Sequence, residues 1–307
     1  LVMVIIFSSF SPVLWKMRLV DFMVGIASCP YLPSGIATLT TLFKSRQWGR
    51  AIAIHELAPN LSFLLAPLIC EALLQWFSWR DVFKALGIAA LLLSVVFAKF
   101  GRGGEFKGDP IGYASYGKLL SNPAFWVMVI LFSLGISSTM GVYSMLSLYL
   151  VTEHGMARNR ANTLIALSRV ASVGVALAGG WATDRFGPRR VLRVVFILTG
   201  LMTVFIGLAS TSWVTVAVFL QPIMAVCFFP AGLAALSMVS AAKERNIAVS
   251  LTVPLAFMVG GGAAPTFIGF MGDVNSFGSG IALVGGAIIM GSIIAGYLRL
   301  QDRPDPN

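Results

Sequence analysis

The sequence predicts an all-α protein that crosses a membrane many times, and its composition is the first reason. Hydrophobic residues make up 57% of the 307 residues and charged residues only 11%, whereas charged residues make up about 25% of a soluble globular chain. The mean hydropathy is +0.86. So few charges cannot cover a water-facing surface, which excludes a soluble enzyme and a disordered chain.

The apolar residues are gathered in long runs, which is the second reason. A hydrocarbon core about 30 Å thick needs roughly 20 helical residues. Leu, Ala, Met and Gly dominate the runs, and the sequence has none of the short alternating segments of a membrane barrel. We therefore expect ten membrane helices. Their candidate spans are 1–15, 19–43, 51–76, 81–98, 123–151, 161–182, 190–210, 213–240, 247–271 and 280–299.

The loops between these runs carry the basic residues, and their distribution predicts the orientation. One set of alternate loops, with the C-terminal tail, holds 15 Lys and Arg residues, whereas the other set holds 6. Membrane proteins keep the loops rich in Lys and Arg in the cytoplasm. We expect a cytoplasmic C-terminus in a plasma membrane or bacterial inner membrane. The net charge of +10 is then a mark of topology, and we expect no nucleic-acid partner.

The longest polar stretch, 99–122, divides the runs into four and six, and the two sides resemble each other. Residues 29–37 align with 226–234 at an offset of 197, which matches Pro33 to Pro230. The basic loops that follow keep the same spacing. Repeated helical bundles are a transporter design, with the substrate site between the halves. Because the first half is shorter, we expect it to lack two spans and the start of a third, which makes the chain a fragment of a twelve-span protein.

Residues 180–192 have a pattern that resembles the signature loop of the major facilitator superfamily. In that family the loop joins helices 2 and 3 and recurs between helices 8 and 9, and here it resembles the second copy. Residues 25–33 resemble the family's fourth helix, and Trp79-Arg80 resembles the turn into the sixth. The residues that carry the loop pattern are Gly180, Asp184, Arg185, Gly187, Arg189 and Arg190.

The resemblance implies two six-helix bundles around a central cavity and transport by alternating access. Helices 3 to 12 of the family would be present: 1–98 as the remainder of the N-terminal bundle, 99–122 as a cytoplasmic linker, and 123–307 as the C-terminal bundle. We expect a monomer in the lipid bilayer, with no cofactor and no metal. The motif resembles a conformational element, so we expect Asp184 to hold the cytoplasmic start of the fifth helix, near Arg50, when that side closes.

Two departures from the family pattern bear on function. The family often has an arginine where this chain has Asp21. The antiporter subgroup has a glycine-rich motif on its fifth helix, and in the matching stretch 62–71 only the proline, Pro67, remains. The second departure disfavours a drug antiporter.

Arg169 is the residue most informative about the substrate. It lies about 12 Å inside the span 161–182 at 1.5 Å per residue, where a charged side chain costs about 2.5–3.5 kcal/mol to insert. Its helical neighbours are small or polar, which suits a cavity. The guanidinium fork binds carboxylates and other oxyanions, and we expect it to bind a small organic or inorganic anion. The alternative is a structural arginine that is paired with carbonyls or with an intramembrane carboxylate.

Three further polar residues are candidates for the substrate site, and two acidic residues are candidates for ion coupling. Ser137 and Tyr143 lie in the span 123–151, and Gln221 precedes a proline in 213–240; each could equally serve helix packing. Asp21 and Glu71 lie toward the outer ends of their spans, where they are either protonatable coupling groups or interfacial charges.

The pair His55-Glu56 begins like a zinc-binding motif, but position 59 is a proline, so we expect an interfacial or gating role.

The leading hypothesis is a secondary transporter of a small anion, driven by a gradient of protons, other ions or substrate. The alternative is a proton-coupled exporter of multiple drugs or other hydrophobic compounds. A membrane enzyme needs a nucleophile, base or metal constellation that the sequence does not show, and a receptor or scaffold does not account for the repeat.

Overall fold

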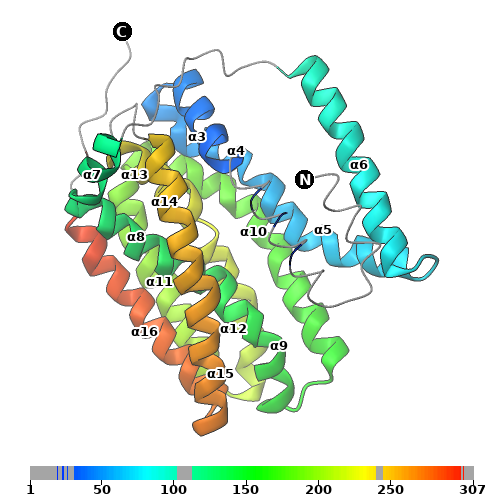
Figure 1. The fold of residues 1–307 in the computed structure, drawn as a ribbon. Coiled ribbons are helices and arrows are strands. Elements are labelled where there is room, and N and C mark those ends of the chain that lie inside the picture. Colours follow the sequence, from blue (N-terminus) through cyan, green and yellow to red (C-terminus); the bar gives the residue numbers. More distant parts are fainter. Residues whose placement is uncertain are drawn as a thin grey trace.

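The computed structural model describes residues 31–101, 113–239, 245–298 and 300, together with Leu19, Met23 and Ile26. Throughout these residues the chain is helical and has no strand (Figure 1). The N-terminal part contains α3 (Tyr31–Leu42), α4 (Trp48–His55), α5 (Leu57–Leu74) and α6 (Trp79–Phe100). The C-terminal part contains α7 (Tyr113–Leu120), α8 (Pro123–Ile136), α9 (Val142–Thr152), α10 (Arg158–Phe186), α11 (Pro188–Leu208), α12 (Thr211–Ala225), α13 (Phe228–Val239), α14 (Arg245–Phe257), α15 (Ala264–Val274) and α16 (Phe277–Gly296).

Three short turns interrupt or precede these helices. A 3-10 turn, η1 (Ser45–Gln47), leads into α4, and two π-helical turns, η2 (Ser137–Gly141) and η4 (Met258–Ala263), join α8 to α9 and α14 to α15. Each π turn keeps its two helices in one continuous rod, so α8–η2–α9 and α14–η4–α15 each span the length of the bundle (Figure 1).

Among the described residues, seven helices are long and apolar enough to cross a membrane. They correspond to the seven expected runs from 81–98 to 280–299. The expected total of ten is not confirmed: the run 1–15 and most of 19–43 lie outside the described residues, and the run 51–76 is divided into α4 and α5. The expected linker 99–122 holds a helix of its own, α7.

The division between α4 and α5 has a local cause. Pro59 has no backbone N–H, so the carbonyl of His55 loses its regular helical partner four residues ahead. The chain turns at Glu56, which ends α4 and precedes the first residue of α5. The break therefore places His55 and Glu56 at a bend within what the sequence presents as one apolar run.

The repeat seen in the sequence is also a repeat of helices. Helices α3 and α13 contain the aligned prolines Pro33 and Pro230, and the next helices, α4 and α14, contain Ala51 and Ala248, which also lie 197 positions apart. The two halves thus place corresponding helices at the same offset as the aligned residues.

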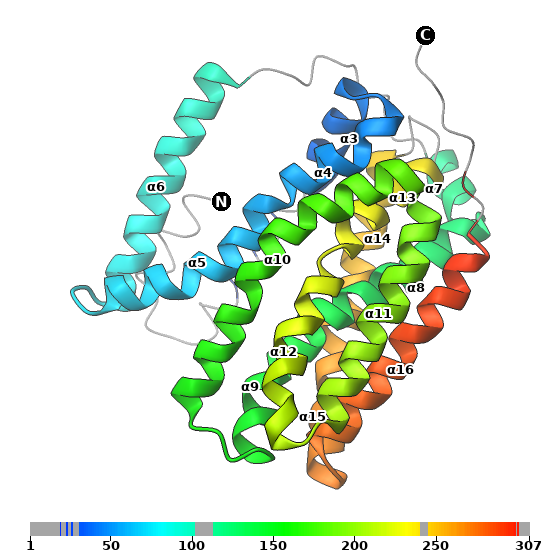
Figure 2. The ribbon, with the colours of Figure 1, turned by 180° about the vertical axis from the view of Figure 1, so that it is seen from behind.

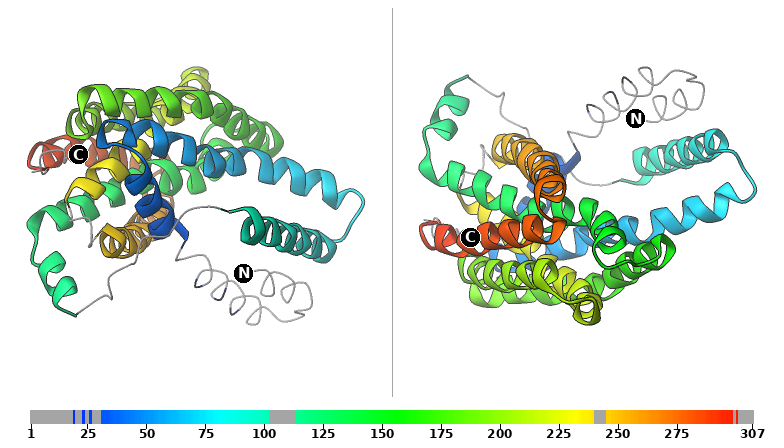
Figure 3. Two further views of the ribbon diagram at one scale, coloured as in Figure 1. Left: turned by 90° about the horizontal axis from the view of Figure 1, so that it is seen from above. Right: turned by 90° about the horizontal axis from the view of Figure 1, so that it is seen from below.

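The two parts of the chain meet where α4 lies along α10, and the views from both sides agree on this (Figures 1 and 2). The contact is close because glycines face each other. A Cβ on Gly49 would lie 2.4 Å from the carbonyl oxygen of Gly180, and a Cβ on Gly180 would lie 2.6 Å from Cβ of Ala53. Seen from above, α6 lies apart from the helices α8–α16 (Figure 3). The parts are therefore joined through α3, α4 and α5, and α6 leaves most of its apolar side chains exposed.

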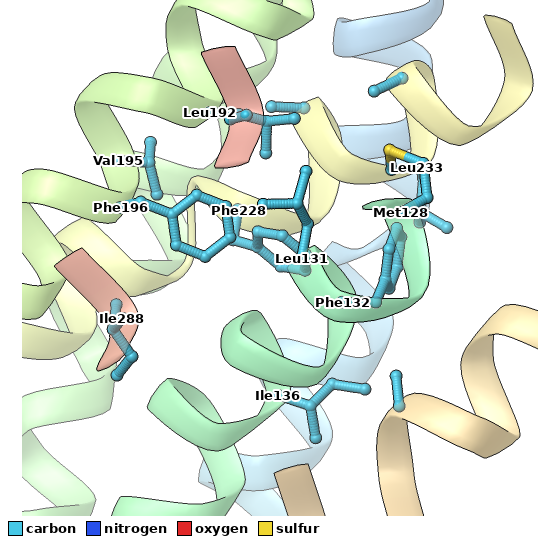
Figure 4. Close-up of a cluster of buried hydrophobic side chains, with 14 of the residues drawn as sticks. Met128, Leu131, Phe132, Ile136, Leu192, Val195, Phe196, Phe228, Leu233 and Ile288 are labelled. Atoms are coloured by element: carbon cyan, nitrogen blue, oxygen red, sulfur yellow. The ribbon is translucent and has the colours of Figure 1, made fainter. Parts of the chain in front are cut away.

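An aromatic cluster fills the centre of the C-terminal part. The ring of Phe228 packs against Phe132 and Phe196, with centroids 5.1 and 5.5 Å away, and all three are almost fully buried (Figure 4). Gly135 leaves the space for this ring, since a Cβ there would lie 2.4 Å from it. The cluster fixes α8, α11 and α13 relative to one another.

Candidate functional site

Arg169 on α10 reaches across the C-terminal part to the π turn η2. Its Nη2 atom donates a hydrogen bond to the carbonyl oxygen of Thr139 at 2.8 Å. Its guanidinium carbon lies 4.0 Å from the centre of the Tyr143 ring. In a π turn the regular backbone hydrogen bonding is interrupted, which makes a carbonyl available to an outside donor. A carbonyl and an aromatic face thus orient the guanidinium, and neither neutralises its charge.

A small pocket of about 20 Å³, which we call the cleft, lies beside this guanidinium, and both parts of the chain form its wall. Asn60 on α5 comes from the N-terminal part, whereas Tyr143, Arg169 and Gln221 come from α9, α10 and α12. The full lining is Asn60, Thr139, Met140, Tyr143, Arg169, Ser172, Gln221, Pro222, Ala225, Val226 and Phe229. Of the residues predicted from sequence as substrate contacts, the structure brings three together here.

Gln221 is fully buried and has unused hydrogen-bonding capacity. Its Nε2 atom donates to the carbonyl of Ser138 at 2.9 Å and to Oγ1 of Thr203 at 3.2 Å. Its Oε1 atom has no partner among the described residues. An unpaired buried acceptor costs about 1–3 kcal/mol, and a hydroxyl group of a bound solute would satisfy it.

Ser137, the fourth predicted contact, does not line the cleft. Its hydroxyl donates to the carbonyl of Ser133 at 2.7 Å, and the residue is buried in η2. Glycines bring η2 against η4, because a Cβ on Gly260 would lie 2.7 Å from the Ser137 nitrogen. The geometry therefore favours the packing alternative for Ser137.

A second cavity of about 310 Å³ adjoins the first and shares Asn60, Met140 and Phe229 with it. Apolar side chains of α8, α13 and α14 form most of its wall, and Tyr31, His55 and Glu56 form its polar side. The phenol oxygen of Tyr31 lies 3.2 Å from His55 Nε2, and His55 Nδ1 lies 3.2 Å from a carboxylate oxygen of Glu56.

The sequence predicted an interfacial or gating role for His55 and Glu56, and it did not single out Tyr31 or Asn60. Asn60 is connected to the same bend, because its amide donates to the backbone carbonyl of Glu56 at 2.7 Å. Pro59, inside an apolar run, was the available signal, since a proline there predicts the bend that turns these side chains toward the cavity.

The loop that follows α10 joins the two parts at one end of the molecule. Asp184 accepts hydrogen bonds from the backbone N–H groups of Gly49 and Arg50, at 2.7 and 3.1 Å, and from Arg50 Nε at 2.9 Å. Its carboxylate thus caps the start of α4, where free N–H groups and the helix dipole favour a negative charge. Gly187 has a φ of +85°, a conformation that favours glycine.

The other residues of the loop motif lie around this joint. Arg189 donates to the carbonyl of Gly296 at the end of α16. Arg190 lines an apolar groove between α10 and α11, and Arg185 is exposed. The motif therefore contacts α4 through its aspartate and α16 through an arginine.

The two acidic residues predicted as coupling groups are not placed at either cavity. Asp21 lies outside the described residues, and Glu71 is described only as part of the backbone of α5. Their coupling role stays a prediction. The described part of the chain also contains no group of three or more His, Cys, Asp or Glu side chains placed to hold a metal ion.

Comparisons with known proteins agree with the fold and the motif. Over residues 1–179 and 138–307 the chain matches the model of the Major Facilitator Superfamily. It is 22% identical to the probable L-galactonate transporter of Escherichia coli K12, over 94% of this chain and 70% of that protein. It is 30% identical to the probable galactarate/D-glucarate transporter GudP of Bacillus subtilis, over 25% of this chain and 17% of that protein.

Among solved structures, the transporter FucP in its outward conformation superposes with a TM-score of 0.77 at 13% identity, over 98% of this chain and 80% of FucP. This likeness concerns the fold. With a family model that covers both halves, a shared fold and the loop motif of Asp184 in place between the halves, the chain belongs to the Major Facilitator Superfamily.

Proposed function

We propose that this chain carries a small organic anion across a cell membrane, and that Arg169 binds the anion's carboxylate. The observation that carries the proposal is the position of the Arg169 guanidinium at a small cleft that is walled by both parts of the chain and adjoins the cavity of about 310 Å³, in which the rest of the anion would lie. A carbonyl and a ring hold the fork in place, and such a fork binds a planar carboxylate through two hydrogen bonds.

The other polar groups of the cleft favour a hydroxylated anion, such as a sugar acid. The free oxygen of Gln221 accepts a hydroxyl hydrogen, and the amide of Asn60 and the phenol of Tyr143 stand at the same cleft. Sites that hydrogen-bond a substrate's hydroxyl groups discriminate strongly against analogues without them. The names of the galactonate and galactarate/glucarate relatives support the same class of substrate.

The transport cycle follows from where the two parts touch. The contact of Asp184 with α4 closes the cleft at the end that we expect to face the cytoplasm. Release of this contact, and closure at the opposite end, would present Arg169 to the other side of the membrane. The protein works as a monomer in a plasma membrane or bacterial inner membrane, with its C-terminus in the cytoplasm.

Uptake by proteoliposomes containing the complete transporter tests the proposal. We expect uptake of radiolabelled L-galactonate, competition by galactarate and D-glucarate, and no competition by the neutral sugar fucose. Arg169→Ala should abolish uptake, and Arg169→Lys should weaken it at least tenfold, because Lys keeps the charge and loses the fork. The control is Arg160→Ala, which removes an arginine at the exposed start of the same helix.

Two results would contradict the anion site. One is retained galactonate uptake by Arg169→Ala. The other is a loss of folded protein in that variant that is restored, with transport, when an acidic partner is also neutralised, since that result makes Arg169 structural. Export of hydrophobic dyes would favour the alternative of a proton-coupled exporter, which the apolar wall of the second cavity supports.

A further inference from the structure

Glu56 is a buried acidic residue with no structural task in the described part of the chain. Its carboxylate is only 8% exposed, yet it forms no side-chain cap on α5, whose start it precedes. Among the described residues it pairs with His55, whose side chain is 14% exposed. Burying a titratable pair is costly, and a purely structural bend at Pro59 does not require one. The pair therefore calls for a functional explanation.

The arrangement of hydrogen bonds around His55 gives the His55–Glu56 pair two well-defined charge states. The carboxylate of Glu56 accepts a hydrogen bond, so His55 Nδ1 carries a hydrogen in both states. In the first state Nε2 is unprotonated and accepts from the hydroxyl of Tyr31, and the pair has a charge of −1. In the second state one added proton occupies Nε2, which then donates to the Tyr31 oxygen, and the pair is neutral.

This charge change occurs in the cavity that adjoins the Arg169 cleft. Asn60, Met140 and Phe229 line both spaces, and the wall of the larger one is mostly apolar, so a charge there is poorly screened. An anion entering the cleft is repelled by the deprotonated pair and is not repelled by the neutral pair. Anion binding and proton binding therefore favour each other, and by linkage each raises the affinity for the other.

The other charged groups around α4 lie elsewhere. On α10, Arg169 belongs to the anion cleft and Asp184 caps the opposite end of α4. On α14, Arg245 lies over the Trp48 ring, and Arg46 is exposed in η1. Helices α8 and α13 carry no titratable side chain toward the cavity, because their sequences contain none among the described residues. Within the described residues, the hydrogen-bond partner of His55 Nε2 is thus Tyr31.

We propose that the His55–Glu56 pair is the site at which the transporter binds its coupling proton, with Tyr31 as its hydrogen-bonding partner. One proton is taken up with one anion on one side of the membrane, and both leave on the other side. This inference rests on the proposed anion site at Arg169. It assigns coupling to the bend between α4 and α5, a position different from Asp21 and Glu71.

The test is the pH dependence of L-galactonate binding to the complete purified transporter, with proton uptake followed by a pH-indicator dye. For the wild type, we expect the dissociation constant to rise by up to tenfold per pH unit as the pH is raised, with about one proton taken up per anion bound. Glu56→Gln mimics the neutral pair, so it should bind galactonate with little pH dependence and take up no proton. It should also retain galactonate exchange while losing accumulation driven by a pH gradient.

His154→Gln is the matched control for His55→Gln. His154 lies at the opposite end of the molecule, with Nδ1 3.2 Å from Thr211 Oγ1, and burial holds its pKa below the ordinary value. We expect His55→Gln to flatten the pH profile and His154→Gln to leave it unchanged.

The possible failures are distinguishable. If the wild type binds no anion, both the proposed function and the proposed proton-coupling site are overturned. If Arg169-dependent binding is intact, but Glu56→Gln keeps the wild-type pH profile and proton uptake, only the coupling site is overturned.

Discussion

At the scale of single residues, Gln221 gives a sharp prediction, because its side-chain nitrogen and its side-chain oxygen have different hydrogen-bonding roles. The Nε2 atom links α12 to η2 and α11 by hydrogen bonds, whereas the buried Oε1 atom has no partner among the described residues. Gln221→Met should therefore weaken binding of hydroxylated anions about tenfold and leave binding of an unhydroxylated dicarboxylate such as adipate nearly unchanged. Competition against labelled L-galactonate measures both. Thr203→Val removes a contact of Nε2 but leaves Oε1 in place, and it serves as the control. Equal losses for both anions in Gln221→Met would make Gln221 purely structural.

The sequence could identify Arg169, Tyr143 and Gln221 as candidates, because charge and amide groups inside apolar runs are rare and costly. It could not separate cavity-lining from packing roles. Ser137 follows the same helical spacing as a cavity-lining residue, yet its hydroxyl bonds the carbonyl of Ser133 within the π turn. That choice depends on which way a π turn rotates the helix, and no residue pattern encodes the rotation.

At the scale of elements, we expect the joint between α10 and α4 to control the proposed transport cycle. The Asp184 carboxylate accepts from two backbone N–H groups and from Arg50, so Asp184→Asn leaves a neutral cap and weakens the joint by about 1 kcal/mol. We expect a lower turnover number with nearly unchanged substrate affinity, measured by initial rates of galactonate uptake and by equilibrium binding. A large loss of affinity at unchanged turnover would show that the loop acts on the substrate.

The close approach of the two helices gives an independent prediction for the same joint. Gly180→Ala places a methyl group 2.6 Å from Ala53 Cβ, and nothing there can yield except the helices themselves. We expect the end closed by Asp184 to open, so that a cysteine introduced at Thr183, now 2% exposed, becomes reactive to a membrane-impermeant thiol reagent. Gly174→Ala on the same helix meets nothing within 4 Å and is the control. Unchanged reactivity in Gly180→Ala would mean that the joint tolerates the methyl group.

Element positions were the most predictable part of the structure. Seven apolar runs each became a helix of membrane length, since burial of apolar residues in lipid requires helices with internally paired backbones. The bend at Glu56 and the two π turns were not predicted. A proline signals a bend, but η2 has no proline and arises from packing against the glycines of η4.

At the scale of the whole molecule, the proposed transport cycle needs an anion site, a neighbouring titratable pair and a contact between the two parts that can open. The central claim is that Arg169 recognises the charge of the substrate. The most direct measurement is a double-mutant cycle by calorimetry on the complete transporter, which pairs Arg169→Gln with a change of ligand from L-galactonate to its neutral amide. The wild type should bind the carboxylate at least tenfold more tightly than the amide, and Arg169→Gln should bind both about equally. A preference for the carboxylate that survives undiminished in Arg169→Gln would contradict the account.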